Sequence, residues 1–450
     1  MRLPKRFPDR DTIAAVRAEA EQLEAGGEAT DERRVAGRVM ARREMGKLTF
    51  LDLVDRSGRI QLLCPVERTG EVDVHLGDVV GAVGRAAKSR RGEPSLAVDR
   101  LELLARIRAP LPDTFHGLTD VEERHRRRYL DLLMNEESRA DFMLRTRMVT
   151  AIRRFLDEDG FVEVETPILQ PRYGGAFARP FLTHHNELDQ TLYLRIATEL
   201  YLKRLIVGGL EKVYEIGKDF RNEGVSFKHN PEFTMLEWYE AYADYGDTMA
   251  RIERLVKRVA AELDKTTVEF RNNAIDLTQE WKRISFVESL GSRWTRNEFE
   301  LRSRLRDEGL DTTHDESWAQ LIDHAFSHFV EPTLIQPTIV FDYPLELSPF
   351  ARTKDDESEL VERFEFFIGG MELGNAFTEI NDSEEQRQRF LEQMGQVGGE
   401  QFDRDYVEAL SYGMPPTGGL GLGIDRLAMV LSGKESIRDV ILFPALRERQ

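Results

Sequence analysis

Residues 220–244 read FRNEGVSFKHNPEFTMLEWYEAYAD, and they decide the fold because a charged loop runs directly into a long apolar strand. Alternate side chains of a strand point to opposite faces. One face therefore carries the set Phe233, Met235, Glu237 and Tyr239. Glu237 stands between Leu236 and Trp238 in an apolar run, which favours a carboxylate that lines a cavity over one exposed on the strand.

Two more segments accompany this stretch, one before it and one after it. Residues 160–167 read GFVEVETP, which predicts a strand that ends at proline, and residues 419–426 read GLGLGIDR before an apolar helical segment. The glycine run lacks the G-x-G-x-x-G spacing of a dinucleotide-binding fold. Each motif is modest alone. In this order and at these separations, the three segments resemble the three signature motifs of class II aminoacyl-tRNA synthetases.

The rest of the chain divides by its strand pattern. Residues 1–34 are expected to form a helical leader. Residues 35–110 hold five short strands of alternating apolar and polar residues, which favours an oligonucleotide-binding (OB) barrel. Residues 111–450 mix strands and helices without a βαβαβ rhythm, so we expect an α+β catalytic domain on an antiparallel sheet. An amphipathic helix is predicted over Arg139–Asp159, with Gly160 as its terminator.

Composition limits the class of protein. The net charge of −18 argues against coating nucleic acid by bulk attraction, and the arginine-rich residues 124–128 are more often a solvated face than a binding site. No apolar run of about 18 residues predicts a membrane span. The single cysteine, Cys64, excludes an internal disulfide and a cysteine-rich zinc site, and these features together predict a cytoplasmic protein. His324 and His328 lack a third metal ligand, which favours an ordinary surface or core pair.

The charged residues around the long strand suit the activation of a carboxylate by ATP. Two guanidiniums, Arg221 and Arg426, can neutralise phosphate oxygens as charge moves onto pyrophosphate. Lys228 and His229, on the intervening loop, can reach the outer phosphates. The ring of Phe233 can stack on adenine. We therefore expect catalysis to depend on Arg221 and Arg426.

A second carboxylate pair occurs in residues 365–372, which read EFFIGGME. A two-residue glycine turn would place Glu365 and Glu372 diagonally on one face, about 7–8 Å apart. Two such carboxylates suit Mg²⁺ that is bound to ATP. Plain alternation puts three following residues on the other face, so either a bulge near Gly374 turns the chain or these residues lie outside the cavity: Asn375, Phe377 and Glu379.

The predicted barrel displays one aromatic ring and one amide. Phe50 stands between Thr49 and Leu51, and Gln61 lies between two aliphatic residues of the next strand. On one barrel face, the two side chains could stack on and hydrogen-bond an unstacked RNA base. A core position for Phe50 is equally compatible with the pattern.

Over residues 35–447, the sequence resembles the bacterial class II lysyl-tRNA synthetases. The stretches that carry the resemblance include YLRIATELYLKRL, FRNEGVSFKHNPEFTMLEWYEAYADY and GLGLGIDRLAMVL. The chain departs from the family pattern at Lys228, where many relatives carry arginine, and at Thr198, which replaces a common proline.

The resemblance implies a role for each matching position. Lysine would be bound by Gly175, Glu199, Glu237, Tyr239, Asn375, Phe377 and Glu379. ATP would be bound by Arg221, Glu223, Lys228, His229, Asn230, Phe233 and Arg426. Mg²⁺ would be held by Glu365 and Glu372, and the anticodon would be read by Phe50, Gln61 and Glu93. The segment that ends at Pro167 lies at the dimer interface in that family, which implies a homodimer.

The implied reaction has two steps. The lysine carboxylate attacks the α-phosphate of ATP to give lysyl-adenylate and pyrophosphate, and lysine then passes to the 3′ end of tRNA(Lys). An aspartyl- or asparaginyl-type synthetase shares the barrel and the motifs, but would need a cation in place of Glu237. A relative that lysylates a protein would usually lack the barrel. An inactive RNA-binding paralogue would be expected to lose some of Arg221, Glu365, Glu372 or Arg426, and all four are present.

Overall fold

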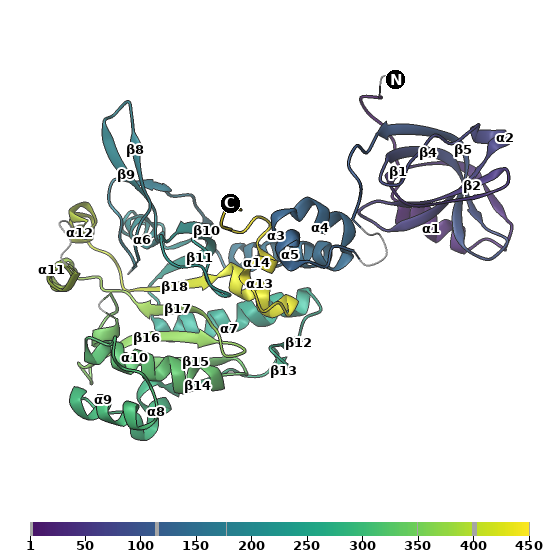
Figure 1. Cartoon of the computed structure of the whole chain (residues 1–450). Coiled ribbons are helices and arrows are strands. Elements are labelled where there is room, and N and C mark those ends of the chain that lie inside the picture. Colours follow the sequence, from purple (N-terminus) through teal and green to yellow (C-terminus); the bar gives the residue numbers. More distant parts are fainter. Residues whose placement is uncertain (1–2, 113–116, 177, 349, 398–402, 450) are drawn as a thin grey trace. The chain divides into compact units, whose positions relative to one another are not determined.

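The computed structural model of this chain describes residues 3–112, 117–176, 178–348, 350–397 and 403–449. The chain divides into two compact units, Met1–Val121 and Glu122–Gln450, whose elements are labelled in Figure 1. The sequence had suggested a boundary at residue 110. Among the described residues, no helix is long and apolar enough to cross a membrane.

The first unit is a closed five-stranded barrel, as the strand pattern predicted. Neighbouring strands follow the order β1 (Glu28–Met45), β2 (Leu48–Val54), β3 (Arg59–Pro65), β5 (Pro94–Ala105) and β4 (Val79–Lys88). A short helix, α2 (Val66–Thr69), follows β3. Alternate residues such as Leu51, Leu53, Ile60 and Leu62 fill the barrel core, and this alternation fixes which side chains face outward.

The residues before the barrel, for which a helical leader over residues 1–34 was predicted, contain one helix that packs against the barrel core. Helix α1 (Ile13–Glu21) begins after Thr12, whose hydroxyl accepts a hydrogen bond from the backbone N–H of Ala15. Its buried residues Ile13, Val16 and Ala20 belong to the barrel core. Strand β1 then begins at Glu28. A helix with one narrow apolar stripe looks the same in sequence whether it stands alone or packs on a barrel.

The second unit is an α+β domain built on an eight-stranded sheet, which confirms the predicted fold class (Figure 1). The strand order is β14 (Lys282–Ser285), β15 (Thr338–Pro344), β16 (Leu360–Phe367), β17 (Glu372–Thr378), β18 (Thr417–Gly423), β11 (Glu232–Ala241), β10 (Lys212–Phe220) and β6 (Val162–Glu163). The six central strands pair antiparallel, and only the outer pairs β14–β15 and β10–β6 are parallel.

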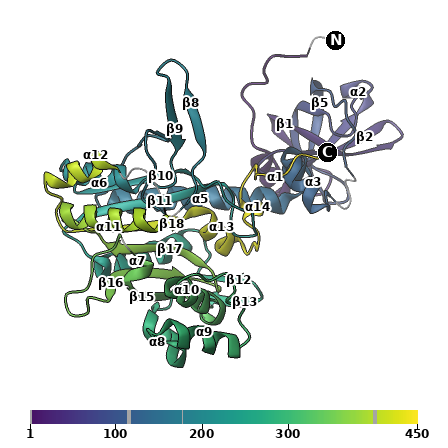
Figure 2. The same ribbon diagram turned by 60° about the vertical axis from the view of Figure 1, so that its left-hand side comes forward.

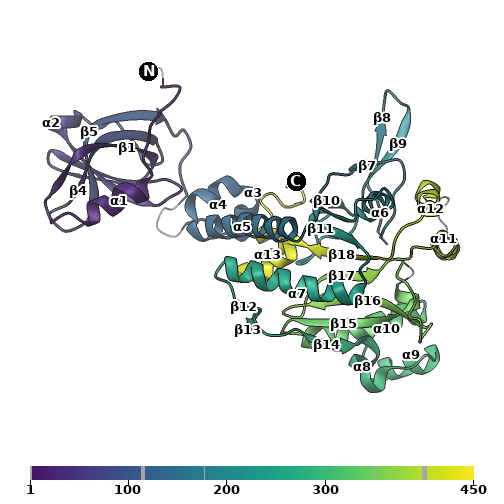
Figure 3. The same ribbon diagram turned by 180° about the vertical axis from the view of Figure 1, so that it is seen from behind.

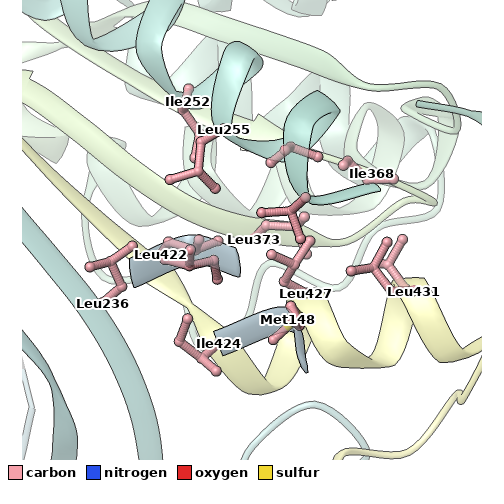
Figure 4. Packing of buried hydrophobic residues seen from close by; sticks show 14 of the residues in the cluster. Met148, Leu236, Ile252, Leu255, Ile368, Leu373, Leu422, Ile424, Leu427 and Leu431 are labelled. Atoms are coloured by element: carbon pink, nitrogen blue, oxygen red, sulfur yellow. The ribbon is translucent and has the colours of Figure 1, made fainter. Parts of the chain in front are cut away.

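Three helices cover one face of this sheet: α5 (Glu136–Glu158), α7 (Tyr245–Glu262) and α13 (Ile424–Ser432) (Figure 3). Helix α5 is the predicted amphipathic helix, and Gly160 follows it with a left-handed φ of 83°. Figure 4 shows Leu236, Leu373 and Leu422 of the strands meeting side chains of α7 and α13. Because this face is filled with core, the opposite face is left for a site.

The chain has further α-helices after the barrel. They comprise α3 (Val121–Arg126), α4 (Arg128–Met134), α6 (Glu199–Val207), α8 (Phe286–Leu290), α9 (Glu298–Asp307), α10 (Trp318–Phe329), α11 (Ser383–Val397), α12 (Arg404–Ser411) and α14 (Ile437–Val440). A hairpin, β12 (Thr267–Phe270) and β13 (Asn273–Asp276), follows α7. Strands β7 (Leu169–Gln170), β9 (Gln190–Leu194) and β8 (Leu182–His185) form a small sheet that projects from the large one (Figure 2).

Candidate active site

Strand register gathers the predicted site residues into rows on the open face of the large sheet. Gly421 of β18 pairs with Glu237 of β11 on one side and with Asn375 of β17 on the other. Asn375 in turn pairs with Glu365 of β16. Residues in register across a sheet point to the same face, so segments more than 180 residues apart in the chain meet here.

A bulge in β17 decides which of its residues face this site. Phe367 pairs with Glu372 beside the glycine turn, whereas Phe366 pairs with Gly374, so Leu373 is the extra residue of a bulge. The extra residue brings Asn375 onto the same face as Glu365. Of the two possibilities that the sequence left open, the bulge is therefore the correct one. Both glycines of the turn have φ of +65°, as a two-residue hairpin turn requires.

Glycines at alternate positions of β18 keep the floor of the site open. A Cβ atom at Gly419 would overlap the carboxylate of Glu379 and approach the ring of Tyr239 to 2.5 Å. A Cβ at Gly421 would lie 3.1 Å from the terminal methyl of Met235. The leucines between these glycines are buried in the core. The sequence prediction gave these glycines no separate role, although their period of two was a visible signal of a strand with one empty face.

Two adjoining cavities open on this face. Their cavity volumes are about 180 Å³ and 200 Å³, and both continue into open solvent. They share four lining residues: Arg221, Met235, Asn375 and Gly421. A ligand in one cavity would therefore meet a ligand in the other beside the Arg221 guanidinium.

The first cavity is lined by all seven residues that the sequence assigned to ATP: Arg221, Glu223, Lys228, His229, Asn230, Phe233 and Arg426. The guanidinium carbon of Arg221 lies 5.0 Å from the centre of the Phe233 ring. Lys228 forms an ion pair of 3.1 Å with Glu331. The Asn230 side chain donates to the carbonyl of Glu232 and accepts from the backbone N–H of Ala445, so it fixes the loop shape.

Arg426 contacts both Glu372, which was predicted to bind Mg²⁺, and His229, which was predicted to bind ATP. Its Nη1 donates to the carboxylate of Glu372 over 3.0 Å, and its Nη2 lies 3.3 Å from Nε2 of His229. Burial lowers the pKa of His229, and the positive charge of Arg426 lowers it further. A neutral imidazole can accept from Arg426 at Nε2 while Nδ1 contacts the Ser226 hydroxyl at 2.8 Å. The imidazole therefore helps to hold the guanidinium in the cavity.

The two carboxylates assigned to Mg²⁺ differ in exposure to this cavity. Glu372 lines it, and Arg426 lowers the pKa of Glu372 although burial acts in the opposite sense. Glu365 does not line it, and the Tyr343 hydroxyl and Arg363 donate to the two oxygens of Glu365. Among the described residues, no group of three or more metal-ligating side chains occurs. Two hard oxygen donors still fit Mg²⁺, because that ion is commonly held by one or two carboxylates together with substrate phosphates.

The second cavity is lined by six of the seven residues that the sequence assigned to lysine: Gly175, Glu199, Glu237, Tyr239, Asn375 and Phe377. Phe177, from the same loop as Gly175, lies outside the described residues. Glu237 accepts hydrogen bonds of 3.3 Å from the backbone N–H of Thr198 and from the Tyr239 hydroxyl. Burial raises the pKa of Glu237 to about 7, and the negative charge of Glu199 adds to the effect.

Glu379, the seventh predicted residue, is buried behind the cavity wall and does not line it. Its carboxylate forms an ion pair with Lys203 of α6, which also binds Glu199 at 2.6 Å. The sequence prediction did not identify Lys203. The available signal was a lysine four residues after Glu199 within the apolar run of ELYLKRLIV, where a solvated cation is out of place.

The barrel carries the predicted anticodon residues on its outer side. Phe50 pairs with Leu63, and two residues further along Asp52 pairs with Gln61, so Phe50 and Gln61 share one face. Phe50 is only partly buried and lies outside the barrel core, which resolves its position. Gln61 accepts a hydrogen bond of 3.3 Å from the hydroxyl of Ser95, and the exposed Glu93 precedes that strand.

Two weaker sequence candidates are explained by local contacts. The arginines of residues 124–128 all form ion pairs with nearby carboxylates, among them Asp131. His324 contacts Asp315 at 3.0 Å, and His328 packs edge-on against Phe329. Both groups have structural partners within the fold.

Comparison with known proteins identifies the family to which this chain belongs. The family model described as tRNA synthetases class II (D, K and N) matches residues 120–447, and that of an OB-fold nucleic acid binding domain matches residues 34–104. The chain is 50% identical to a lysine–tRNA ligase of Roseiflexus sp. (strain RS-1) over 99% of this chain and 95% of the relative. It is 46% identical to a lysine–tRNA ligase of Dehalococcoides mccartyi over 98% and 93%, respectively. With the paired cavities on an antiparallel sheet, these matches show that the chain belongs to the class II tRNA synthetases of the D, K and N group.

Proposed function

We propose that this protein is a lysine–tRNA ligase, which activates L-lysine with ATP and transfers it to tRNA(Lys). The observation that carries the proposal is the position of Glu237. Its carboxylate is 6% exposed and lines the second cavity, and no ion pair joins it to a cation in the part of the chain that the structure describes. A buried carboxylate without a counter-ion is stabilised by a ligand that brings an ammonium group.

The geometry also suits the first chemical step. Lysine with its side-chain ammonium at Glu237 would direct its carboxylate toward Arg221, where the two cavities meet. That carboxylate is already ionised, so positioning and charge stabilisation suffice, and a general base is not needed. Arg221 and Arg426 would bind the phosphate oxygens as charge moves onto pyrophosphate. Mg²⁺, held by Glu372 and Glu365 with the outer phosphates, would supply further neutralising charge.

The test is ATP–pyrophosphate exchange with each of the twenty amino acids offered separately. We expect exchange with lysine alone. Exchange with aspartate or asparagine would instead assign the protein to a sister activity of the same family. No exchange from a folded protein that binds ATP would favour a regulatory RNA-binding role. The aspartate alternative already has a structural difficulty, because Glu199 and Glu237 would repel a side-chain carboxylate.

Lysine binding should depend on pH because Glu237 must be ionised to hold an ammonium group. With a pKa near 7 in the free protein, Glu237 is mostly protonated at pH 6 and mostly ionised at pH 8. Lysine affinity should therefore rise about tenfold per pH unit up to pH 7 and level off above it. Calorimetry at pH 6.5 in two buffers of different ionisation enthalpy should detect release of most of one proton. Binding without proton release would contradict the assignment.

A substitution on the outer face of the barrel should impair the use of tRNA and leave lysine activation unchanged. Phe50→Ala removes a ring on which a base can stack, and base–aromatic stacking contributes about 1–3 kcal/mol. We expect kcat/KM for tRNA(Lys) to fall about five- to 150-fold in aminoacylation, while ATP–pyrophosphate exchange stays unchanged. Met45→Ala, an exposed apolar residue at the end of β1, is the matched control. An equal loss in both variants would indicate general damage to the barrel.

A homodimer is part of the proposal. Apolar side chains are exposed in and just after the segment that ends at Pro167 and on the small sheet that follows it: Val162, Ile168, Leu169, Leu182 and Leu188. Exposed apolar side chains of this size suit burial at an interface between two copies of the chain. Sedimentation equilibrium should give about twice the chain mass of 51.9 kDa. We also propose a cytoplasmic location, because the tRNA and ATP that the enzyme would use are found there.

A further inference from the structure

Lys203 is a fully buried cation beside the second cavity, and its surroundings form an ammonium-binding site. Its Nζ atom contacts the carboxylates of Glu199 and Glu379. It also lies over the rings of Tyr239 and Phe377, 5.7 Å and 5.5 Å from their centres. Carboxylates and aromatic faces are the groups that bind ammonium ions. The wall of the cavity therefore holds an internal ammonium beside the place proposed for the substrate's ammonium.

The cluster contains more carboxylates than ammonium groups. Glu199, Glu237 and Glu379 are three carboxylates, and Lys203 is the single ammonium that forms ion pairs with any of them within the described residues. When all three carboxylates are ionised, their negative charge exceeds the charge of Lys203 by two. Free lysine brings two ammonium groups, one on its side chain and one at its α-carbon, which would offset this excess while its carboxylate is directed toward Arg221. Without Lys203, three carboxylates would share one buried site, and at least one of them would take up a proton.

We propose that Lys203 is a positioning residue that sets the charge of the lysine cavity, because it neutralises part of the carboxylate charge and so allows Glu237 to ionise when the substrate binds. This inference rests on the proposed lysine–tRNA ligase function. Glu199 and Glu379 outweigh the effect of burial and raise the pKa of Lys203 well above its usual value, so it stays charged at neutral pH. Lys203 itself does not line the cavity, so it acts through its two carboxylate partners.

Other charged or titratable groups face this cluster from neighbouring elements, and the substitutions below leave all of them in place. They are Arg195, Arg204, Glu215, Asp219, Arg221, Tyr239 and Tyr406. Their effect on the pH midpoint of lysine affinity is the same in every variant. A difference in midpoint between variants therefore arises from Lys203 and Glu379.

The test is a charge-matched series of four proteins: the wild type, Lys203→Met, Glu379→Gln and the double variant. Lysine binding is measured by calorimetry from pH 5.5 to 8.5, and the pH midpoint of affinity is compared. Lys203→Met adds one uncompensated negative charge, so its midpoint should rise by about one to three pH units. Glu379→Gln removes one, so its midpoint should fall below that of the wild type. The double variant has the wild-type net charge, and its midpoint should return close to 7.

A return of the pH midpoint to the wild-type value in the double variant would distinguish charge compensation from a purely structural role of Lys203. A structural role predicts that the double variant binds lysine no better than Lys203→Met, with no ordered change in midpoint. Midpoints that agree within about 0.3 pH unit in all folded variants would overturn the inference. Should Lys203→Met not fold, the comparison of Glu379→Gln with the double variant still decides the question. A wild type that does not bind lysine at all would instead refute the proposed function.

Discussion

Glu237→Gln should abolish lysine activation while ATP binding is retained. The amide keeps the size of the side chain but cannot balance an ammonium group in a buried site. Leaving such a charge unpaired costs about 3–5 kcal/mol, and well-built polar sites discriminate by up to 10⁴–10⁵. We expect kcat/KM for lysine to fall on the order of 10³–10⁵ in ATP–pyrophosphate exchange. The ATP dissociation constant should be unchanged, because Glu237 does not line the first cavity.

The control for this variant is Glu232→Gln, the same change at an exposed position of the same strand. Thermal unfolding adds a second check. The fold raises the pKa of Glu237 from 4.5 to about 7, so its contribution to stability is fully present below pH 4.5 and is lost as the pH rises through 7. Glu237→Gln lacks this loss, so it should be at least as stable as the wild type at pH 8. Lysine kinetics within threefold of the wild type would refute the role of Glu237.

Arg426→Ala should remove most of the catalytic rate and spare lysine binding. Arg426 lines the first cavity, contacts Glu372 and His229, and is absent from the lining of the second cavity. Removing one preorganised donor to a developing oxyanion typically lowers kcat by about 10²–10³. We expect a loss of that size in the exchange reaction with lysine. The variant also leaves Glu372 without its counter-ion near the phosphates, which acts in the same direction.

Arg387→Ala is the matched control, because Arg387 is an exposed arginine of α11 that pairs with Glu384. It should leave the exchange rate unchanged. Lysine binding by calorimetry should be the same for the wild type, the control and Arg426→Ala. If Arg426→Ala lowers the lysine affinity as much as it lowers the rate, the separation of the two cavities is wrong.

Local sequence rules were enough to predict much of this protein's structure. Strand alternation placed Phe233, Met235, Glu237 and Tyr239 on one face, and the register bears this out. A two-residue glycine turn fixed the pairing of Phe367 with Glu372, because few backbone geometries close such a hairpin. The same local rules could not show that the helix within residues 1–34 packs on the barrel, because that burial depends on contacts with residues that follow in the chain.

Sequence by itself determined the α+β class and the barrel, because these depend on periodicity and residue type. Its resemblance to a family supplied thirteen of the residues that line the two cavities. Only the tertiary structure decided the bulge at Leu373, which turns Asn375 toward Glu237. It also placed Glu379 behind the wall and put the ammonium of Lys203 between two carboxylates. These features arise where side chains from α6, β11, β17 and β18 meet. The charge balance of a buried site is a sum over such neighbours, and no single segment contains it.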